Sequence, residues 1–192
     1  MKWVILAILV SIGTYTFLTL EYRKPDRAFR PYEDIRDRAN VHRLLEAGYQ
    51  RITLEADLPA DSMTFDSSAR ATATAGGLPA GLGKTLVTPP QLPAEIVSVS
   101  AAPAVNSLFA YPIGVKCTLP DNKQQLAGGE LYVHDDELIV TPNFERLAGG
   151  LLARNRERLI RLTVPAGSLK PGRYRVTLVG AHSSRAWTLQ VH

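Results

Sequence analysis

Three patterns of apolar and polar residues follow one another along the chain. The first is an unbroken run over residues 3–20, eighteen positions without a charged side chain. As a helix, such a run rises about 27 Å, which is close to the hydrocarbon thickness of a bilayer. No small-x-small cleavage pair and no cysteine follow the run, so it does not fit a cleaved signal or a lipoprotein anchor. The pattern predicts a transmembrane anchor over residues 1–20.

The second pattern has helical spacing. Pro31 stands where a first turn would begin, two acidic residues follow it, and Gly48 comes after the last apolar position, as at the two ends of a helix. Between these signals runs an imperfect apolar stripe: Ile35, Ala39, Val41, Leu44 and Leu45. Residues 21–31 mix charges, aromatic side chains and prolines, which suits the headgroup layer of a membrane. We therefore expect a juxtamembrane collar and an amphipathic helix over residues 21–48.

The third pattern is strict alternation, which indicates strands with one buried face. It first appears over residues 49–58 and returns in seven short runs after Glu95. The inward positions of these runs are Val97 and Val99; Val115, Cys117 and Leu119; Leu131 and Val133; Leu138 and Val140; Ile160, Leu162 and Val164; Tyr174, Val176 and Leu178; and Trp187, Leu189 and Val191. The runs predict an antiparallel β-sandwich over residues 95–192. Residues 49–94 are expected to hold one strand and a long Pro/Gly/Ala-rich loop.

Composition and charge exclude several classes of function. The 192 residues include 22 Lys and Arg against 18 Asp and Glu, a formal net charge of +4. The signs are interspersed and no basic patch carries stacking aromatic residues, so we expect no nucleic-acid partner. The single cysteine, Cys117, excludes an intrachain disulfide and a multi-cysteine metal site. Its inward position predicts a buried core thiol.

No group of residues has the spacing of a catalytic or metal site. The residues able to bind copper are scattered, with no two at ligand spacing: His42, Met63, Cys117, His134, His182 and His192. Ser183 and Ser184 stand beside a histidine, but they lack the turn and the orienting acid of a hydrolase. The sequence therefore predicts no catalytic residue, no metal ligand and no cofactor.

Basic residues are the candidate contact residues. The collar contributes Arg23, Lys24, Arg27 and Arg30. These suit lipid headgroups or a partner protein, or a solvated stalk without a specific contact. A second group consists of Arg154, Arg156 and Arg158, which share one phase and lead into an inward-facing run. Such a basic face could bind an acidic partner or anionic headgroups, or protect an open sheet edge against aggregation.

One segment resembles a known corner. In residues 164–178, a leucine and a Pro-Gly turn precede Tyr174, as they precede a late strand of bacterial immunoglobulin-like domains, where the tyrosine hydroxyl bonds back to the chain. Trp187, inward in the last run, adds to this resemblance. The layout of anchor, short helix and sandwich is similar to FixH and YtkA-like membrane proteins. That resemblance implies an immunoglobulin-like fold and a role in copper handling and oxidase assembly.

These features predict a mainly β protein with an N-terminal single transmembrane helix, a short amphipathic helix and an antiparallel immunoglobulin-like β-sandwich. We expect a single-pass protein of the inner (cytoplasmic) membrane with an extracytoplasmic domain, although a literal count of basic residues places the domain in the cytoplasm. The expected function is non-catalytic: protein–protein contact as an accessory subunit of a membrane or envelope complex, with the lipid bilayer as a further partner. The alternative is a copper-handling or oxidase-assembly accessory protein.

Overall fold

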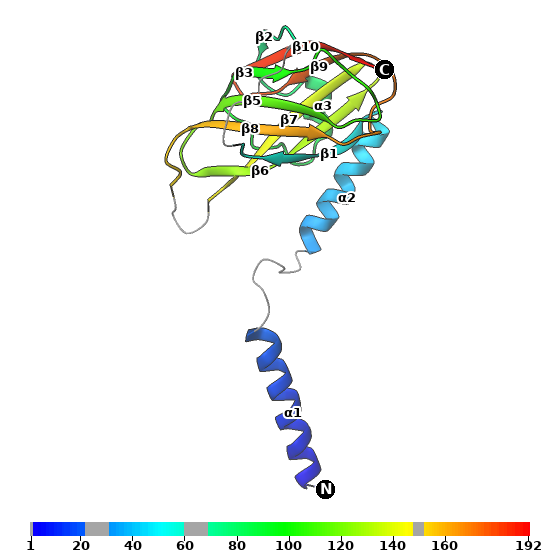
Figure 1. The fold of residues 1–192 in the computed structure, drawn as a ribbon. Coiled ribbons are helices and arrows are strands. Elements are labelled where there is room, and N and C mark those ends of the chain that lie inside the picture. The colour runs from blue at the N-terminus through cyan, green and yellow to red at the C-terminus, as the bar shows by residue number, and fades with distance from the viewer. Residues whose placement is uncertain (1, 22–30, 60–68, 148–151) are drawn as a thin grey trace. The chain divides into compact units, whose positions relative to one another are not determined.

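The computed structural model describes residues 2–21, 31–59, 69–147 and 152–192 (Figure 1). The chain divides into two compact units, Met1–Ile35 and Arg36–His192. The first contains helix α1 (Lys2–Glu21) and the beginning of helix α2 (Pro31–Glu46). Several large apolar side chains of α1 are exposed: Trp3, Ile8, Val10, Ile12, Tyr15 and Phe17.

The expected membrane anchor is not supported by the structure. A membrane-spanning helix needs about 20 consecutive, predominantly apolar residues. Within the described part of the chain, no helix is both long and apolar enough to cross a membrane. This finding overturns the transmembrane anchor predicted for residues 1–20. It also overturns the single-pass topology and the inner-membrane location with an extracytoplasmic domain.

The second unit is built on a ten-stranded sheet, in which eight strands form a closed ring. The ring strands are β1 (Gln50–Asp57), β3 (Glu95–Ala101), β5 (Tyr111–Thr118), β6 (Gln124–His134), β7 (Glu137–Arg146), β8 (Glu157–Val164), β9 (Gly172–Leu178) and β10 (Ser183–Val191). They pair in the order β10-β3-β5-β8-β1-β6-β7-β9, and β9 pairs in turn with β10. Two short strands, β2 (Thr72–Ala75) and β4 (Ala104–Val105), also pair with β10.

This closed barrel replaces the predicted immunoglobulin-like sandwich, in which two separate sheets would face each other. Strand β1 lies between β8 and β6 and pairs with both. Strand β9 lies between β7 and β10 and pairs with both. These two strands join what would have been two layers into one sheet (Figure 1). Alternation indicates which side chains point inward, but it does not specify which strands become neighbours.

The ring closes at a narrow seam between β10 and β3, where Ser183 and Glu95 are in register. Two main-chain hydrogen bonds beside this pair, each 2.8 Å, tie the turn before β10 to the segment before β3. The guanidinium of Arg185 donates to the carbonyls of Ile96 and Val97 at 3.1 and 2.8 Å. The register of β3 against β5 shifts just after Ile96, and a bulge of this kind leaves main-chain groups outside the ladder. Arg185 therefore supplies hydrogen-bond donors at the strand boundary where the ring has the fewest paired residues.

We predict that Arg185→Met lowers the free energy of unfolding by about 2–3 kcal/mol, because two carbonyls lose a charged donor while the stem of the side chain is kept. Urea denaturation followed by circular dichroism measures the change. The matched control is Lys170→Met, which removes an exposed cation. Equal midpoints for the two variants would contradict the role of Arg185 in closure.

Inward-facing side chains fill the barrel. The following are fully buried: Val115, Cys117, Leu119, Leu131, Ile160, Leu162, Leu178 and Leu189. The Tyr111 hydroxyl accepts a hydrogen bond of 3.1 Å from Trp187 Nε1 and donates one of 2.8 Å to the carbonyl of Ala102. Burial raises the pKa of Tyr111 to about 12, which keeps the hydroxyl protonated as a donor. The core thus encloses the polar groups of Tyr111 and Trp187, which are hydrogen-bonded to each other.

The buried thiol predicted for Cys117 is confirmed, and burial raises its pKa to about 12. The thiolate is the species that reacts with alkylating reagents. We predict that iodoacetamide at about pH 8 leaves native Cys117 unmodified, because the folded thiol stays protonated and enclosed. Mass spectrometry should show one alkylated cysteine only after unfolding in urea. Modification of the folded chain at the rate of the unfolded chain would contradict this.

A second apolar cluster lies on the outer face of the barrel, over β6, β7 and the end of β9. Its members are Leu44, Leu82, Leu86, Tyr132, Ile139 and Val179. Leu82 belongs to helix α3 (Ala80–Thr85), which, like β2, lies in the stretch expected to be a long loop. Leu44 comes from α2 and is the buried member of the predicted stripe, whereas Ile35, Val41 and Leu45 are exposed.

We predict that Leu82→Ala costs about 2–4 kcal/mol of unfolding free energy, because a fully buried leucine is what fixes this short helix on the sheet. The control is Leu108→Ala, since the Leu108 side chain is 76% exposed. Denaturant melts of both variants give the comparison. A loss no larger for Leu82→Ala than for the control would show that α3 is held by other contacts.

Candidate interaction surfaces

The structure separates the two predicted groups of contact residues. The collar group, Arg23, Lys24, Arg27 and Arg30, lies outside the described residues. The second group leads into β8: Arg154 and Arg156 are exposed, and Arg158 is half-buried. Strand β8 pairs with β5 along its full length but with β1 only from Arg161 onward. Among the described strands, the first residues of β8 therefore have one open side.

Two further cations come from distant parts of the sequence. The amide of Leu147 donates to the carbonyl of Lys123 at 2.8 Å, and the amide of Ala153 donates to the carbonyl of Asn122 at 2.6 Å. The Leu119 amide also bonds to the carbonyl of Arg156, at 2.9 Å. These main-chain contacts gather three segments at one end of the barrel. We call the resulting cation group the basic end: Lys123, Arg146, Arg154, Arg156 and Arg158.

Sequence reasoning missed Lys123 and Arg146, although a signal for them exists. Strands β6 and β7 form a hairpin whose turn follows His134, and the register places Gln124 opposite Arg146. Counting outward from the predicted turn would have brought residues 123 and 146 to the same end of that hairpin. Their approach to Arg154 could not be found in this way, because it depends on the path of the loop between β7 and β8.

Three cations on the barrel wall are paired with carboxylates. Arg51 forms a two-pronged ion pair with Glu130, and this hydrogen bonding raises the pKa of Arg51. Arg161 holds Asp57 at 2.7 Å in the same way, and Lys116 lies 3.0 Å from Glu157. Each pair joins neighbouring strands, so charge on the wall is neutralised where strands meet.

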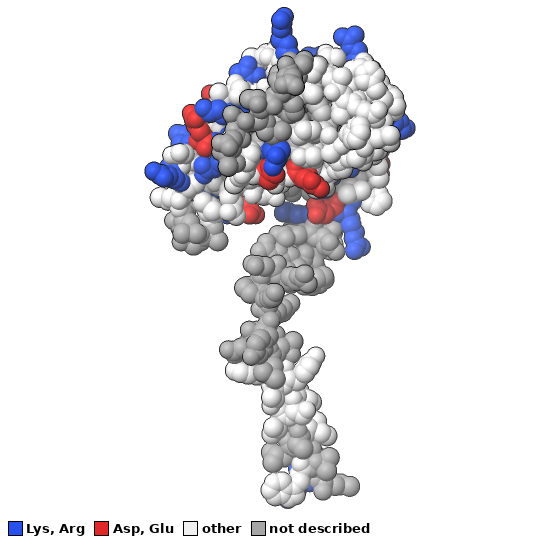
Figure 2. Space-filling view, viewed as in Figure 1, with Lys and Arg blue, Asp and Glu red and all other residues white. Residues whose placement is uncertain are grey.

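The basic end differs from the wall because none of its five cations forms an ion pair with another described residue. Arg156 donates instead to the carbonyl of Leu119 at 3.0 Å, and Arg158 donates to that of Glu157 at 3.1 Å. The nearby carboxylate of Asp121 accepts from the Lys123 amide. At the left of the domain, Figure 2 shows Lys and Arg side chains with Asp and Glu side chains among them. The basic end therefore keeps a local excess of positive charge.

The structure places the candidate metal ligands and the serines beside His182 as follows in the described ranges. No group of three or more His, Cys, Asp or Glu in these ranges could hold a metal ion. Among the copper candidates, Cys117 is buried in the core, and the His134 ring packs against Tyr49 with centroids 4.7 Å apart. Ser184 is buried, and its hydroxyl contacts main-chain atoms of Gly180. Met63 lies outside the described residues.

Comparison of the chain with protein-family models, curated proteins and solved structures finds no match. The chemistry of the surface is therefore what bears on function, and the basic end differs from the ion-paired positions on the wall beside it.

Proposed function

We propose that this chain is a non-catalytic binding protein whose basic end docks on an acidic surface of another protein. One observation carries the proposal: five cations from three segments meet at one end of the barrel without a carboxylate partner among the described residues. Unpaired exposed cations favour encounter with an acidic partner and give specificity to the orientation of docking. Copper handling, the alternative implied by the resemblance, rests on that resemblance alone.

Hydrogen bonds hold two cations of the basic end in place. This favours specific recognition of a partner over a role in keeping the protein soluble. Arg156 Nε donates to the carbonyl of Leu119 at 3.0 Å, and the Arg158 guanidinium donates to the carbonyl of Glu157 at 3.1 Å. A fixed cation loses less conformational entropy on binding than a free one. The ion pairs of Lys116 with Glu157 and of Arg161 with Asp57 neutralise the wall next to the basic end, so docking is directed to the basic end.

We predict that the triple variant Lys123→Gln, Arg146→Gln and Arg154→Gln lowers affinity for immobilised poly-L-glutamate about tenfold, because each lost exposed ion pair contributes about 0.2–1 kcal/mol. These three positions are chosen because their side chains are exposed and make no hydrogen bond that the fold needs. Biolayer interferometry on the full chain measures the change. Binding should also weaken as salt is raised, since salt screens exposed charges.

The matched control removes the same charge elsewhere, with Arg70→Gln, Lys84→Gln and Lys170→Gln, three exposed cations outside the basic end. The control should stay within about twofold of the unmodified chain. Equal losses in both triples would show that net charge alone drives binding. Tighter binding to phosphatidylserine vesicles or to duplex DNA than to poly-L-glutamate would replace the acidic protein by another class of partner.

A further inference from the structure

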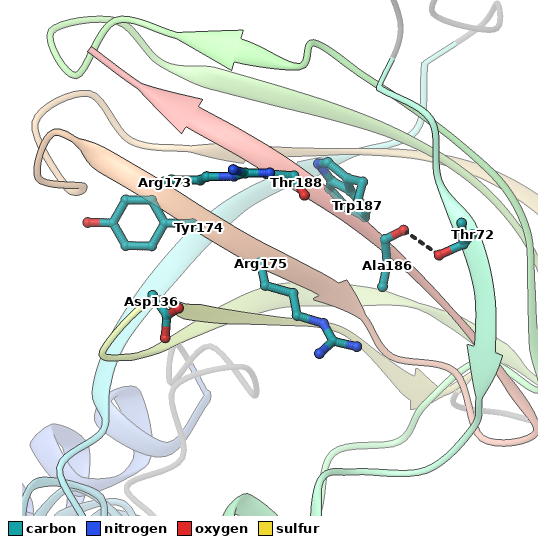
Figure 3. Close-up of a pocket in the computed structure, with 8 residues that line it drawn as sticks. All are labelled: Thr72, Asp136, Arg173, Tyr174, Arg175, Ala186, Trp187 and Thr188. Atoms are coloured by element: carbon teal, nitrogen blue, oxygen red, sulfur yellow. Dashed lines mark hydrogen bonds between the residues drawn. The ribbon is translucent and has the colours of Figure 1, made fainter.

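A groove on the outer wall, formed by β9, β10 and the start of β2, is separate from the basic end. Its volume is about 400 Å³, within the range of small-ligand sites. The lining residues are Thr72, Asp136, Arg173, Tyr174, Arg175, Ala186, Trp187 and Thr188 (Figure 3). None of the interactions described above for the basic end involves these residues.

The two arginines of the groove are placed by the alternation of β9. Tyr174 points into the core, so Arg173 and Arg175 on either side of it point outward. The Tyr174 hydroxyl donates to the carbonyl of Lys170 at 3.0 Å, which is the back-bond expected for this corner. The Arg175 amide donates to the carbonyl of Asp136 at 2.8 Å. Both arginines therefore lie on a strand that hydrogen bonds fix at its beginning and along one side.

The floor of the groove is formed by closely packed residues of β10. Ala186 and Trp187 are 6% and 4% exposed. On one side, the Thr72 hydroxyl donates to the carbonyl of Ala186 at 3.2 Å, drawn as a dashed line in Figure 3.

The two guanidinium groups of the groove point in different directions. In Figure 3, Arg173 extends toward Thr188 of β10, whereas Arg175 extends from the other side of β9. Thr188 is in register with Arg175, so its hydroxyl lies on the same outer face as the two arginines. Neither arginine forms an ion pair with another described residue. Asp136 is the one carboxylate among the lining residues, against two cations.

We propose that this groove binds a small ligand carrying two separated oxyanion groups, one held by Arg173 with Thr188 and the other by Arg175. Guanidinium groups present forked donors that match carboxylate or phosphate oxygens. Because the two forks diverge, one small anion cannot engage both, whereas a ligand with an anionic group at each end can. The methyl group of Ala186, on the outer face of β10, offers an apolar contact to the short chain between the two groups.

The test compares ligands that differ only in the number of anionic groups. Isothermal titration of the full chain is made with glutarate against acetate, and with pyrophosphate against inorganic phosphate, up to about 10 mM, a range that reveals millimolar binding. We expect the ligand with two anionic groups to bind at least about tenfold more tightly in one or both series, which also identifies the preferred oxyanion. Equal affinities within both series, or no binding in either, would overturn the proposal.

Variants locate the site. Arg173→Gln and Arg175→Gln should each reduce the affinity of the two-group ligand to about that of the one-group ligand, because one anchor is lost. The control Lys84→Gln removes the same charge outside the groove and should leave both affinities unchanged. If both arginine variants still bind the two-group ligand more tightly than the one-group ligand, the proposal is overturned. If only the triple variant Lys123→Gln, Arg146→Gln and Arg154→Gln weakens binding, the ligand binds at the basic end instead, which also overturns the proposal.

Discussion

Closure of the sheet through β10 is the constraint on which the rest of the second unit depends. That strand pairs with β9 along most of its length, with β2 and β4 in short segments, and with β3 at the seam. The β3 contact is the narrowest of these, and Arg185 donates to main-chain carbonyls just beside it. A closed sheet leaves no long unpaired edge, so the barrel can keep charged loops at one end without exposing a template for aggregation.

The strands themselves could be predicted, because alternation is local. All eight ring strands coincide with runs in which apolar and polar residues alternate, and the tyrosine corner at Tyr174 forms the expected back-bond to Lys170. Strand neighbours could not be predicted, because β1 reaches its place between β6 and β8 across a long intervening stretch. Alternation also misplaced Val97 of β3, which was predicted to point inward. A bulge after Ile96 shifts the phase, so Ile96 is buried and Val97 is 40% exposed.

Candidate contact residues were predicted only where they are neighbours in sequence. Arg154, Arg156 and Arg158 share one phase and could be found by reading along the chain. Lys123 and Arg146 join them through the β6–β7 register and through main-chain bonds to the loop before β8. The groove arginines Arg173 and Arg175 were not singled out, since two outward cations on a strand are also what an ordinary solvated face contains.

Clustering distinguishes the unpaired cations of the basic end and the groove from single exposed cations such as Arg70, Lys84 and Lys170. An excess of four positive charges could be spread evenly over the chain. The fold instead pairs Arg51, Lys116 and Arg161 with carboxylates across strand boundaries. It leaves unpaired the cations at the basic end and in the groove. Exposed ion pairs contribute little to stability, so folding alone gives no strong reason for this division. Recognition of anionic groups does, because an unpaired guanidinium needs no internal partner to be displaced before it binds.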